Sequence, residues 1–299
     1  LVLNSTMILN GSGNLVFAGA GGTTQNIFSP TGTAVIRVAD APNTSRSALV
    51  TQSIDSGTGS AARTVVIHSG VTVQGSGGNG SFAQIGAAGQ IWVNQGTITA
   101  TAASADLTVR GRFYNEGTIT AATGTSVHLI GDSLIAGQLG WTNFGQTDNP
   151  GTIQVTGGTL SMSGNWSNVG PMGTPIILVN NGTLNLGGSF TTAVIGTINR
   201  SGGSVNITGA LDNTGATLVL DDTTGSLIAV SGSITGGTIQ ASGAAQITQP
   251  LGSFTLAGVT ALNAPWTMLG GNGSTTLNVR GDLVLNSTMI LNGSGNLVF

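Results

Sequence analysis

The first seventeen residues of this chain return, letter for letter, as its last seventeen: residues 1–17 and residues 283–299 both read LVLNSTMILNGSGNLVF. Unrelated stretches do not match in this way by chance, so we interpret the chain as one full period, positions 1–282, followed by the first seventeen residues of the next. A single globular enzyme has no reason to restart, whereas a tandem array of near-identical units does. The repeat therefore favours a structural or adhesive function, and a duplicated edge segment in a self-contained domain is the alternative.

A shorter repeat lies within the long one. Its pattern is apolar-x-apolar-x-Gly-x-apolar, as in LTVRGRF at 107–113, LSMSGNW at 160–166 and VNITGAL at 205–211. The recurrent glycine stands at Gly164, Gly188, Gly209, Gly232, Gly258 and Gly281. The residues between these glycines alternate in polarity, which is the period of a β-strand and not of a helix.

Repeat units of about 20–26 residues, with short strands joined by Gly and Asn turns, are typical of the coils of a β-solenoid. We expect an all-β fold in which 1–299 form one continuous parallel β-solenoid (a right-handed β-helix), with coils of about 20–26 residues, about a dozen coils per period and almost no helix. Strand starts of the form Gly-Thr-(Ile or Leu) recur, and an Asn stands two places before several of them, at Asn94, Asn115, Asn149 and Asn180. We assign these Asn to turns, because Gly and Asn accept positive φ. Residues 18–60 are the least regular and could form a protrusion.

The apolar positions of the alternation predict the core. We expect inward columns that include Ile98, Val109, Ile119, Leu129, Ile153, Leu160, Leu184, Leu186, Ile207 and Leu218. We expect four aromatic residues to cap or flank these columns, namely Trp92, Phe113, Trp166 and Phe190, and Thr99 to lie outside. Surplus residues should leave the coils as loops at 141–150, 168–175 and 261–266, each of which contains Pro, a residue that cannot donate inside a central ladder.

Composition narrows the classes of function. The net charge is −3 with no Lys, and the seven cations are all Arg, so nucleic acid is a poor partner. There is no Cys, which excludes disulfides and thiolate metal sites, and no apolar run approaches the ~20 residues of a membrane span. With only 6% charged residues, the surface has little electrostatic repulsion and should associate with copies of itself or with a matrix.

No motif assembles a catalytic or metal site. Asp221 and Asp222 are the only adjacent carboxylates, and they precede Thr-Thr-Gly, which favours a turn role over catalysis. His68 and His128 stand in strand-like runs without partners at metal-ligand spacing. We therefore expect no enzymatic activity and no catalytic, cofactor or metal site, with calcium at scattered loop oxygens left open.

Three further patterns have structural explanations. The tripeptide Arg280-Gly281-Asp282 resembles an integrin-binding sequence, but Gly281 falls on the recurrent coil glycine. Thr-x-Thr pairs at 97–99 and 118–120 resemble ice-binding arrays, but the later coils lose them. Sequons such as the one at Asn165 are expected by chance in a chain so rich in Asn, Ser and Thr.

Phrases such as NEGTI at 115–119 and NGTLNLGG at 181–188 resemble giant repeat-rich bacterial surface and secreted proteins: filamentous-haemagglutinin-like adhesins and autotransporter passengers. The resemblance covers residues 86–299 and is poor over 18–60. It implies a right-handed β-helix that serves attachment, biofilm scaffolding or cell-surface filaments, with no catalytic residues to carry over.

We therefore expect an extracellular or cell-surface structural protein whose units continue end to end as a filament, stalk or matrix fibre. Its partners would be copies of itself and cell-surface glycans or matrix. The main alternative is an adhesin stalk that presents a carbohydrate- or receptor-binding tip. An ice-binding solenoid and a polysaccharide-acting β-helix enzyme are the weaker alternatives.

Overall fold

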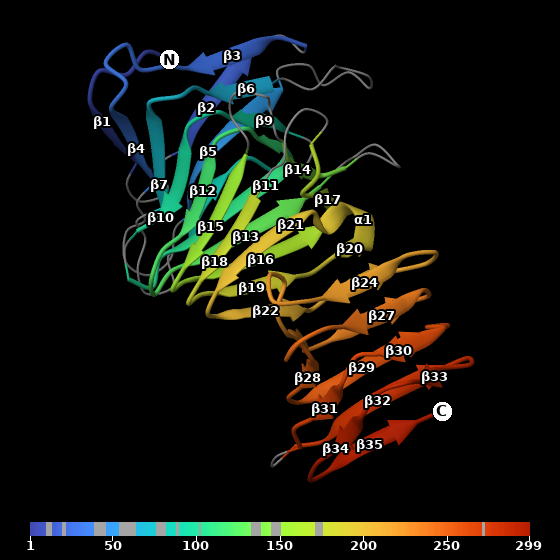
Figure 1. Cartoon of the computed structure of the whole chain (residues 1–299). Helices are drawn as coiled ribbons and strands as arrows, with labels where there is room; N and C mark the ends of the chain where they lie inside the picture. Colours follow the sequence, from blue (N-terminus) through green and yellow to red (C-terminus); the bar gives the residue numbers. More distant parts are fainter. Residues whose placement is uncertain are drawn as a thin grey trace.

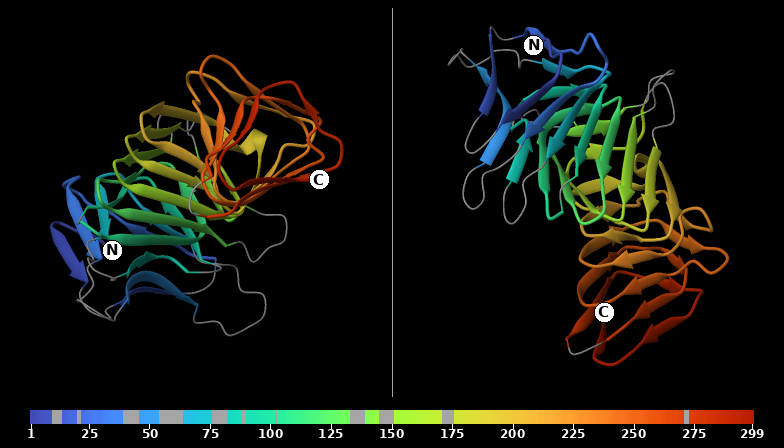
Figure 2. Two further views of the ribbon diagram at one scale, coloured as in Figure 1. Left: turned by 90° about the horizontal axis from the view of Figure 1, so that it is seen from below. Right: turned by 90° about the vertical axis from the view of Figure 1, so that its left-hand side faces the viewer.

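The chain is a parallel β-solenoid, as its sequence predicts. The computed structural model describes residues 1–9, 14–19, 22–38, 46–53, 64–75, 82–87, 90–101, 103–132, 139–144, 151–170, 176–270 and 273–299. Strands make up 62% of the structure and helix 2%, so the expected near-absence of helix is confirmed. The strands stack coil upon coil, the direction of stacking changes between the N-terminal and C-terminal halves, and the two termini lie at opposite ends (Figures 1 and 2). The right-handed sense of the coil stays a prediction.

Each coil passes through three faces in a fixed order, which we call face 1, face 2 and face 3. Face 2 carries one unbroken parallel ladder of twelve strands: β2 (Asn14–Gly19), β5 (Arg46–Ser53), β8 (Phe82–Ile85), β11 (Asp106–Asn115), β13 (Ser126–Gly131), β16 (Thr159–Gly164), β19 (Thr183–Leu186), β22 (Ser204–Ile207), β25 (Leu227–Ala229), β28 (Ile247–Gln249), β31 (Trp266–Met268) and β34 (Met289–Leu291).

Face 1 consists of two sheets. The first contains β1 (Thr6–Leu9), β4 (Ala34–Val38), β7 (Val71–Gly75), β10 (Thr97–Ala100), β12 (Thr118–Ala121), β15 (Thr152–Thr156), β18 (Ile176–Asn180) and β21 (Thr197–Ser201). The second contains β24 (Thr217–Leu220), β27 (Thr238–Ala241), β30 (Ala261–Asn263) and β33 (Val284–Leu285).

Face 3 also divides into two sheets. The first contains β3 (Thr24–Ile27), β6 (Thr64–Ile67), β9 (Ile91–Asn94), the second half of β11, β14 (Trp141–Asn143) and β17 (Trp166–Ser167). The second contains β20 (Ser189–Thr191), β23 (Ala210–Asp212), β26 (Gly232–Thr235), β29 (Gly252–Ala257), β32 (Thr275–Arg280) and β35 (Gly295–Val298). One bridge, Asn165↔Ser189, joins the two sheets.

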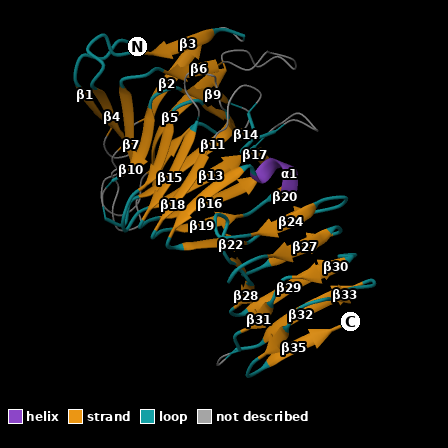
Figure 3. Ribbon diagram, in the orientation of Figure 1, coloured by secondary structure: helices purple, strands orange, loops and turns teal. Residues whose placement is uncertain are grey.

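The break in faces 1 and 3 coincides with the short helix α1 (Thr192–Ile195), which stands at the side of the stack in Figure 3. Face 1 pairing stops at β21 and resumes at β24, while face 2 continues through the break. The face 2 ladder therefore joins the two halves of the solenoid.

The register partners on face 2 show how long each coil is. From β16 onward the partners follow one another closely along the chain, as in Leu227↔Ile247 and Ile247↔Trp266, and these coils have about the expected length. The pairs Asn14↔Ala48 and Ser126↔Thr159 enclose longer stretches of chain, parts of which lie outside the described residues. Within 18–60, β3, β4 and β5 are ladder strands, and the remainder of that stretch lies largely outside the described residues.

The predicted core columns are confirmed. All ten predicted aliphatic positions are buried, as are the four aromatic residues, which lie within the core and not merely at its margin. On face 3, Trp141 stacks on Trp166 with ring centroids 5.9 Å apart, and Trp166 stacks on Phe190 at 4.8 Å. Identical or similar side chains therefore lie above one another, which is what in-register coils require.

Three local expectations are wrong. Thr99 is only 9% exposed, although it has the outward parity of β10. Trp141 begins strand β14 and is buried, so the first part of the expected loop at 141–150 is a strand, and residues 145–150 lie outside the described residues. Residues 261–266 form β30 and the start of β31, so Pro265 occupies a tight corner between strands and marks no long loop.

Glycine lines the corner between faces 2 and 3. A Cβ atom on Gly188 would lie 2.1 Å from the backbone oxygen of Gly164, and φ at Gly188 is +71°. The same close approach recurs along the stack, since a Cβ atom on Gly232 would lie 2.0 Å from the oxygen of Gly209. From Gly164 to Gly232 the recurrent glycine therefore marks a corner where successive backbones are too close for a side chain. Gly258 and Gly281 instead follow the face 3 strands β29 and β32, where an added Cβ atom would meet no close backbone atom.

Asparagine lines the corner between faces 3 and 1. The Nδ2 atom of Asn94 donates to Oδ1 of Asn115 at 2.8 Å, Asn115 donates to Asn143 at 2.8 Å, and Asn143 donates to Asn168 at 2.7 Å. All four side chains are at most 1% exposed. Asn94 and Asn115 were expected to hold turns by positive φ; instead, among the described residues only Ser104 and Asn181 do so without being glycine. These Asn stabilise the corner with their amide side chains.

Candidate functional site

The two duplicated segments form the two end coils of the stack. Residues 1–17 contain β1 and β2 at one end, and residues 283–299 contain β33, β34 and β35 at the other. In the C-terminal coil, inward side chains are incompletely covered: Leu291 is 44% exposed, although its register partner Met268 is fully buried in the coil below. The end coils therefore present apolar core positions and a strand edge with no described coil beyond them.

Outward positions of the duplicated segment are also apolar. Each of its three strands reads apolar-apolar-apolar, as LVL, MIL and LVF, so the middle residue faces away from the core. Ile8 is 51% exposed and its copy Ile290 is 44% exposed. Elsewhere many outward positions are Thr, Asn, Ser or Gln, as in the burial pattern of β22 and β19. The duplicated coil is thus more apolar on its outside than those coils.

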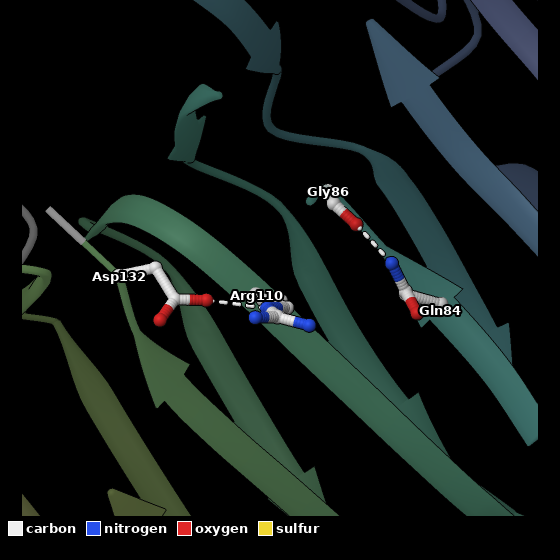
Figure 4. Close-up of polar contacts among 4 residues, drawn as sticks. All are labelled: Gln84, Gly86, Arg110 and Asp132. Carbon is white, nitrogen blue, oxygen red and sulfur yellow. Dashed lines mark hydrogen bonds and ion pairs between the residues drawn. The ribbon is translucent and has the colours of Figure 1, made fainter. Parts of the chain in front are cut away.

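A cluster of charged side chains lies on the outer surface of face 2. Arg110 in β11 donates from Nε to Asp132, just after β13, and Gln84 donates from Nε2 to the Gly86 oxygen at 2.6 Å (Figure 4). His128 lies 3.4 Å from Asp106, measured from Nε2 to Oδ1. Gln84, Asp106, Arg110 and His128 line a shallow depression of about 210 Å³.

His128 therefore has a partner that the sequence analysis missed. Asp106 comes from the neighbouring coil, because Asp106 is in register with Ser126 and Thr108 with His128. Aligning each coil of the sequence with the next would have brought the two groups together. Both side chains are partly exposed, so the pair is worth little in stability.

The other residues that the sequence analysis considered are dispersed. Asp221 holds a turn: its Oδ1 atom accepts from the backbone N–H groups of Thr223 at 2.9 Å and Thr224 at 2.8 Å. These two hydrogen bonds lower the pKa of the Asp221 carboxyl, and the one from Thr224 has the larger effect. His68 contacts Asn26, with 2.8 Å between Nε2 and Oδ1. The expected turn role of Asp221 is confirmed.

The remaining motifs follow the coil. Arg280 ends β32, and Gly281, with φ of +85°, turns the chain away from it. Thr99 and Thr120 stack in register on face 1, but Gln74 and Gln154 flank them in the adjacent coils. The Thr-x-Thr array is thus limited to two coils.

A third feature is an apolar groove of about 600 Å³ beside α1. Its walls include Trp166, Phe190, Val194 and Leu211, with Asp212 at one side. Hydrogen bonds from Thr214 lower the pKa of Asp212. The groove lies where the two sheets of face 3 are offset, and no sequence signal pointed to it.

No family model, curated protein or solved structure matches this chain. Within the described residues, no group of three or more His, Cys, Asp or Glu is placed to hold a metal ion. None of the described helices has the length and apolarity to cross a membrane. The feature with the clearest functional implication is therefore the pair of duplicated end coils.

Proposed function

We propose that this chain is a unit of an extracellular structural protein in which successive copies of the long period continue one solenoid end to end, as a filament, stalk or matrix fibre. The observation that carries the proposal is the identity of the two end coils. The segment that closes one end of the stack is the same segment that opens the other. Covalent joining of successive units and association of separate chains would both satisfy it.

Physical chemistry supports continuation. An open strand edge pairs readily with another strand, and natural proteins usually block such edges with charge, Pro or a covering element. Residues 283–299, which form the C-terminal coil, contain no charged residue and no Pro. Leu285 and Leu291 in this coil are 46% and 44% exposed. A further coil would bury these side chains, at about 25 cal/mol for each Å² of apolar surface removed from water.

An adhesin stalk is the second candidate, and the outer surface of face 2 favours it. Beyond the charged cluster, a second shallow depression of about 530 Å³ is lined by Ser161, Ser163, Asn185 and Thr208. Rows of hydroxyl and amide groups are suited to hydrogen bonding with glycans. In this version the rod itself, or a tip elsewhere in a larger protein, makes the contact.

The test is the length of the particles that the chain forms. Purified protein is examined by light scattering and electron microscopy over a hundredfold range of concentration. End-to-end continuation predicts rods that lengthen with concentration at constant width. Single rods of one length at every concentration would exclude filament formation by separate chains, and covalently joined units would then have to be examined to decide between the filament and the stalk.

A matched pair of variants separates axial from lateral association. Leu291→Lys places a charge at an inward position of the open end, whereas Ile290→Lys places the same charge at the adjacent outward position. Leu291→Lys should shorten the rods strongly, because the next coil would bury an unpaired ammonium group. Ile290→Lys should leave rod length nearly unchanged, and the opposite ranking would indicate lateral packing.

A further inference from the structure

The two copies of the seventeen-residue segment occupy different faces of the coil. In the N-terminal copy, Val2 pairs with Phe28 beside β3 on face 3, β1 lies on face 1 and β2 lies on face 2. In the C-terminal copy, the corresponding parts are β33 on face 1, β34 on face 2 and β35 on face 3. Every part of the segment is displaced forward by one face.

The displacement preserves which side chains face the core. Met7 and its copy Met289 both pack against the core, as do Leu15 and its copy Leu297. Ile8 and Ile290 both point outward. Because each strand of the segment has an inward pair of apolar side chains around an outward one, the segment suits any of the three faces.

The displacement fixes how many coils one period contains. The face 2 ladder advances by eleven coils between its first strand, β2, and its last, β34. The copy of β2 is β35, one face beyond β34. One period therefore winds about eleven and one third coils, and a whole number is reached only after three periods, or about 34 coils.

Resting on the proposed function, we infer that successive units are related by a screw whose rotation includes one third of a turn. Face 2 of one unit then continues into face 1 of the next, and face 3 continues into face 2. At a coil spacing of about 4.8 Å, the rise is about 54 Å per unit and about 163 Å for three units. The stack's own twist adds to this rotation.

The screw determines what the filament surface displays. The charged cluster of Asp106, Arg110 and His128 lies on face 2 of each unit. In consecutive units this cluster points to three different sides, and before the stack's own twist is added it returns to the same side in every third unit. A ligand of face 2, such as a glycan, would therefore find sites all around the filament instead of along one stripe.

Cysteine pairs test the displacement in the chain as it exists. The sequence has no Cys, so an engineered pair reacts without competition. Thr267 and Ile290 are register partners on face 2, and the inference predicts that Thr267→Cys with Ile290→Cys cross-links rapidly on mild oxidation. If the C-terminal segment lay on the same faces as its N-terminal copy, residue 290 would lie on face 1. The variant with Asn263→Cys and Ile290→Cys would then cross-link instead.

A positive control outside the duplicated segment lies on face 1. Gln240 and Asn263 are outward register partners of β27 and β30, so Gln240→Cys with Asn263→Cys should also cross-link. Circular dichroism of each reduced variant confirms that the strands remain. Cross-linking of the 263–290 pair, or failure of the 267–290 pair while the control reacts, overturns the inference.

A chain of three consecutive copies of residues 1–282, imaged by electron cryo-microscopy, tests the screw itself. The expected result is one rod in which equivalent strands of adjacent units lie on adjacent faces. A continuous rod in which equivalent strands of all units lie on the same face overturns the inference and leaves end-to-end continuation intact. Three separate particles on a string contradict the proposed function.

Discussion

At the scale of single residues, the asparagine ladder links neighbouring coils through buried amide groups. Each amide in the series from Asn94 to Asn143 donates to the amide of the next coil, which satisfies polar atoms that water cannot reach. The ladder ends at α1, where Asn168 donates to the Ile195 oxygen at 2.9 Å. From the helix itself, Thr192 donates to Oδ1 of Asn213 at 2.6 Å. The helix thus substitutes for one member of the series.

The first prediction concerns the middle of this ladder. Asn115→Ala leaves the Asn94 donor and the Asn143 acceptor without their partner, and should lower the free energy of unfolding by about 2–5 kcal/mol. Asn115→Asp should lower it further at neutral pH, because a buried carboxylate cannot donate to Asn143. Urea denaturation measures both effects.

The pH dependence of Asn115→Asp has a definite sign. Burial should raise the carboxyl pKa in the folded state above its unfolded value of about 3.9. The destabilisation caused by the buried carboxylate is then greatest above the folded pKa and disappears as the pH falls below about 4. Asn199→Asp, at an exposed position of β21, is the control and should cost little at any pH. A pH-independent penalty at position 115 would contradict the ladder.

The second prediction concerns Asp221, whose pKa is lowered by the Thr224 and Thr223 backbone N–H groups. Because the folded pKa lies below the unfolded value, its contribution is present above about pH 4 and is lost as the pH falls through the folded pKa. Asp221→Ala should therefore be destabilising at pH 7 and nearly neutral well below the folded pKa. Asp221→Asn retains an acceptor oxygen, so its stability at pH 7 should lie between that of the unchanged protein and that of Asp221→Ala. Equal stability of all three proteins at pH 7 would exclude the turn role.

At the scale of elements, the corners determine where each strand ends. Gly188 and Gly215 have nearly equal φ values of +71° and +70°, but only Gly188 has a backbone oxygen within reach of an added Cβ. The third prediction is that Gly188→Ala lowers the free energy of unfolding by several kcal/mol, while Gly215→Ala costs about 1–2 kcal/mol for its φ alone. Thermal or urea unfolding of the two variants measures the difference. Equal costs would place the corner elsewhere.

The elements also show which signals the sequence contains. Alternating polarity and the recurrent glycine predicted the strands and the core, because inward positions such as Ile207 must be apolar in every coil. The Asn ladder was missed because a buried amide and a turn amide have the same letter, and only stacking distinguishes them. The Asp106–His128 pair joins neighbouring coils, so local spacing could not show it. The helix α1 is one turn long, too short for a helical period to be visible.

At the scale of the whole molecule, the duplicated segment decides what the stack can become. Its two copies close opposite ends, preserve the inward and outward alternation and differ by one face. A continuous ladder on face 2 passes through the offset near α1, so the stack remains one body across the break in the other two faces. Continuation beyond residue 299 would repeat the same contacts in each unit.

The most direct test of this account is the length of rods with one, two, three and four consecutive units. We expect small-angle X-ray scattering to give a constant cross-section and a length that increases by about 54 Å with every added unit. Such equal increments require each unit to continue the stack of the one before it. Unequal increments, or a cross-section that grows with the number of units, would contradict end-to-end continuation.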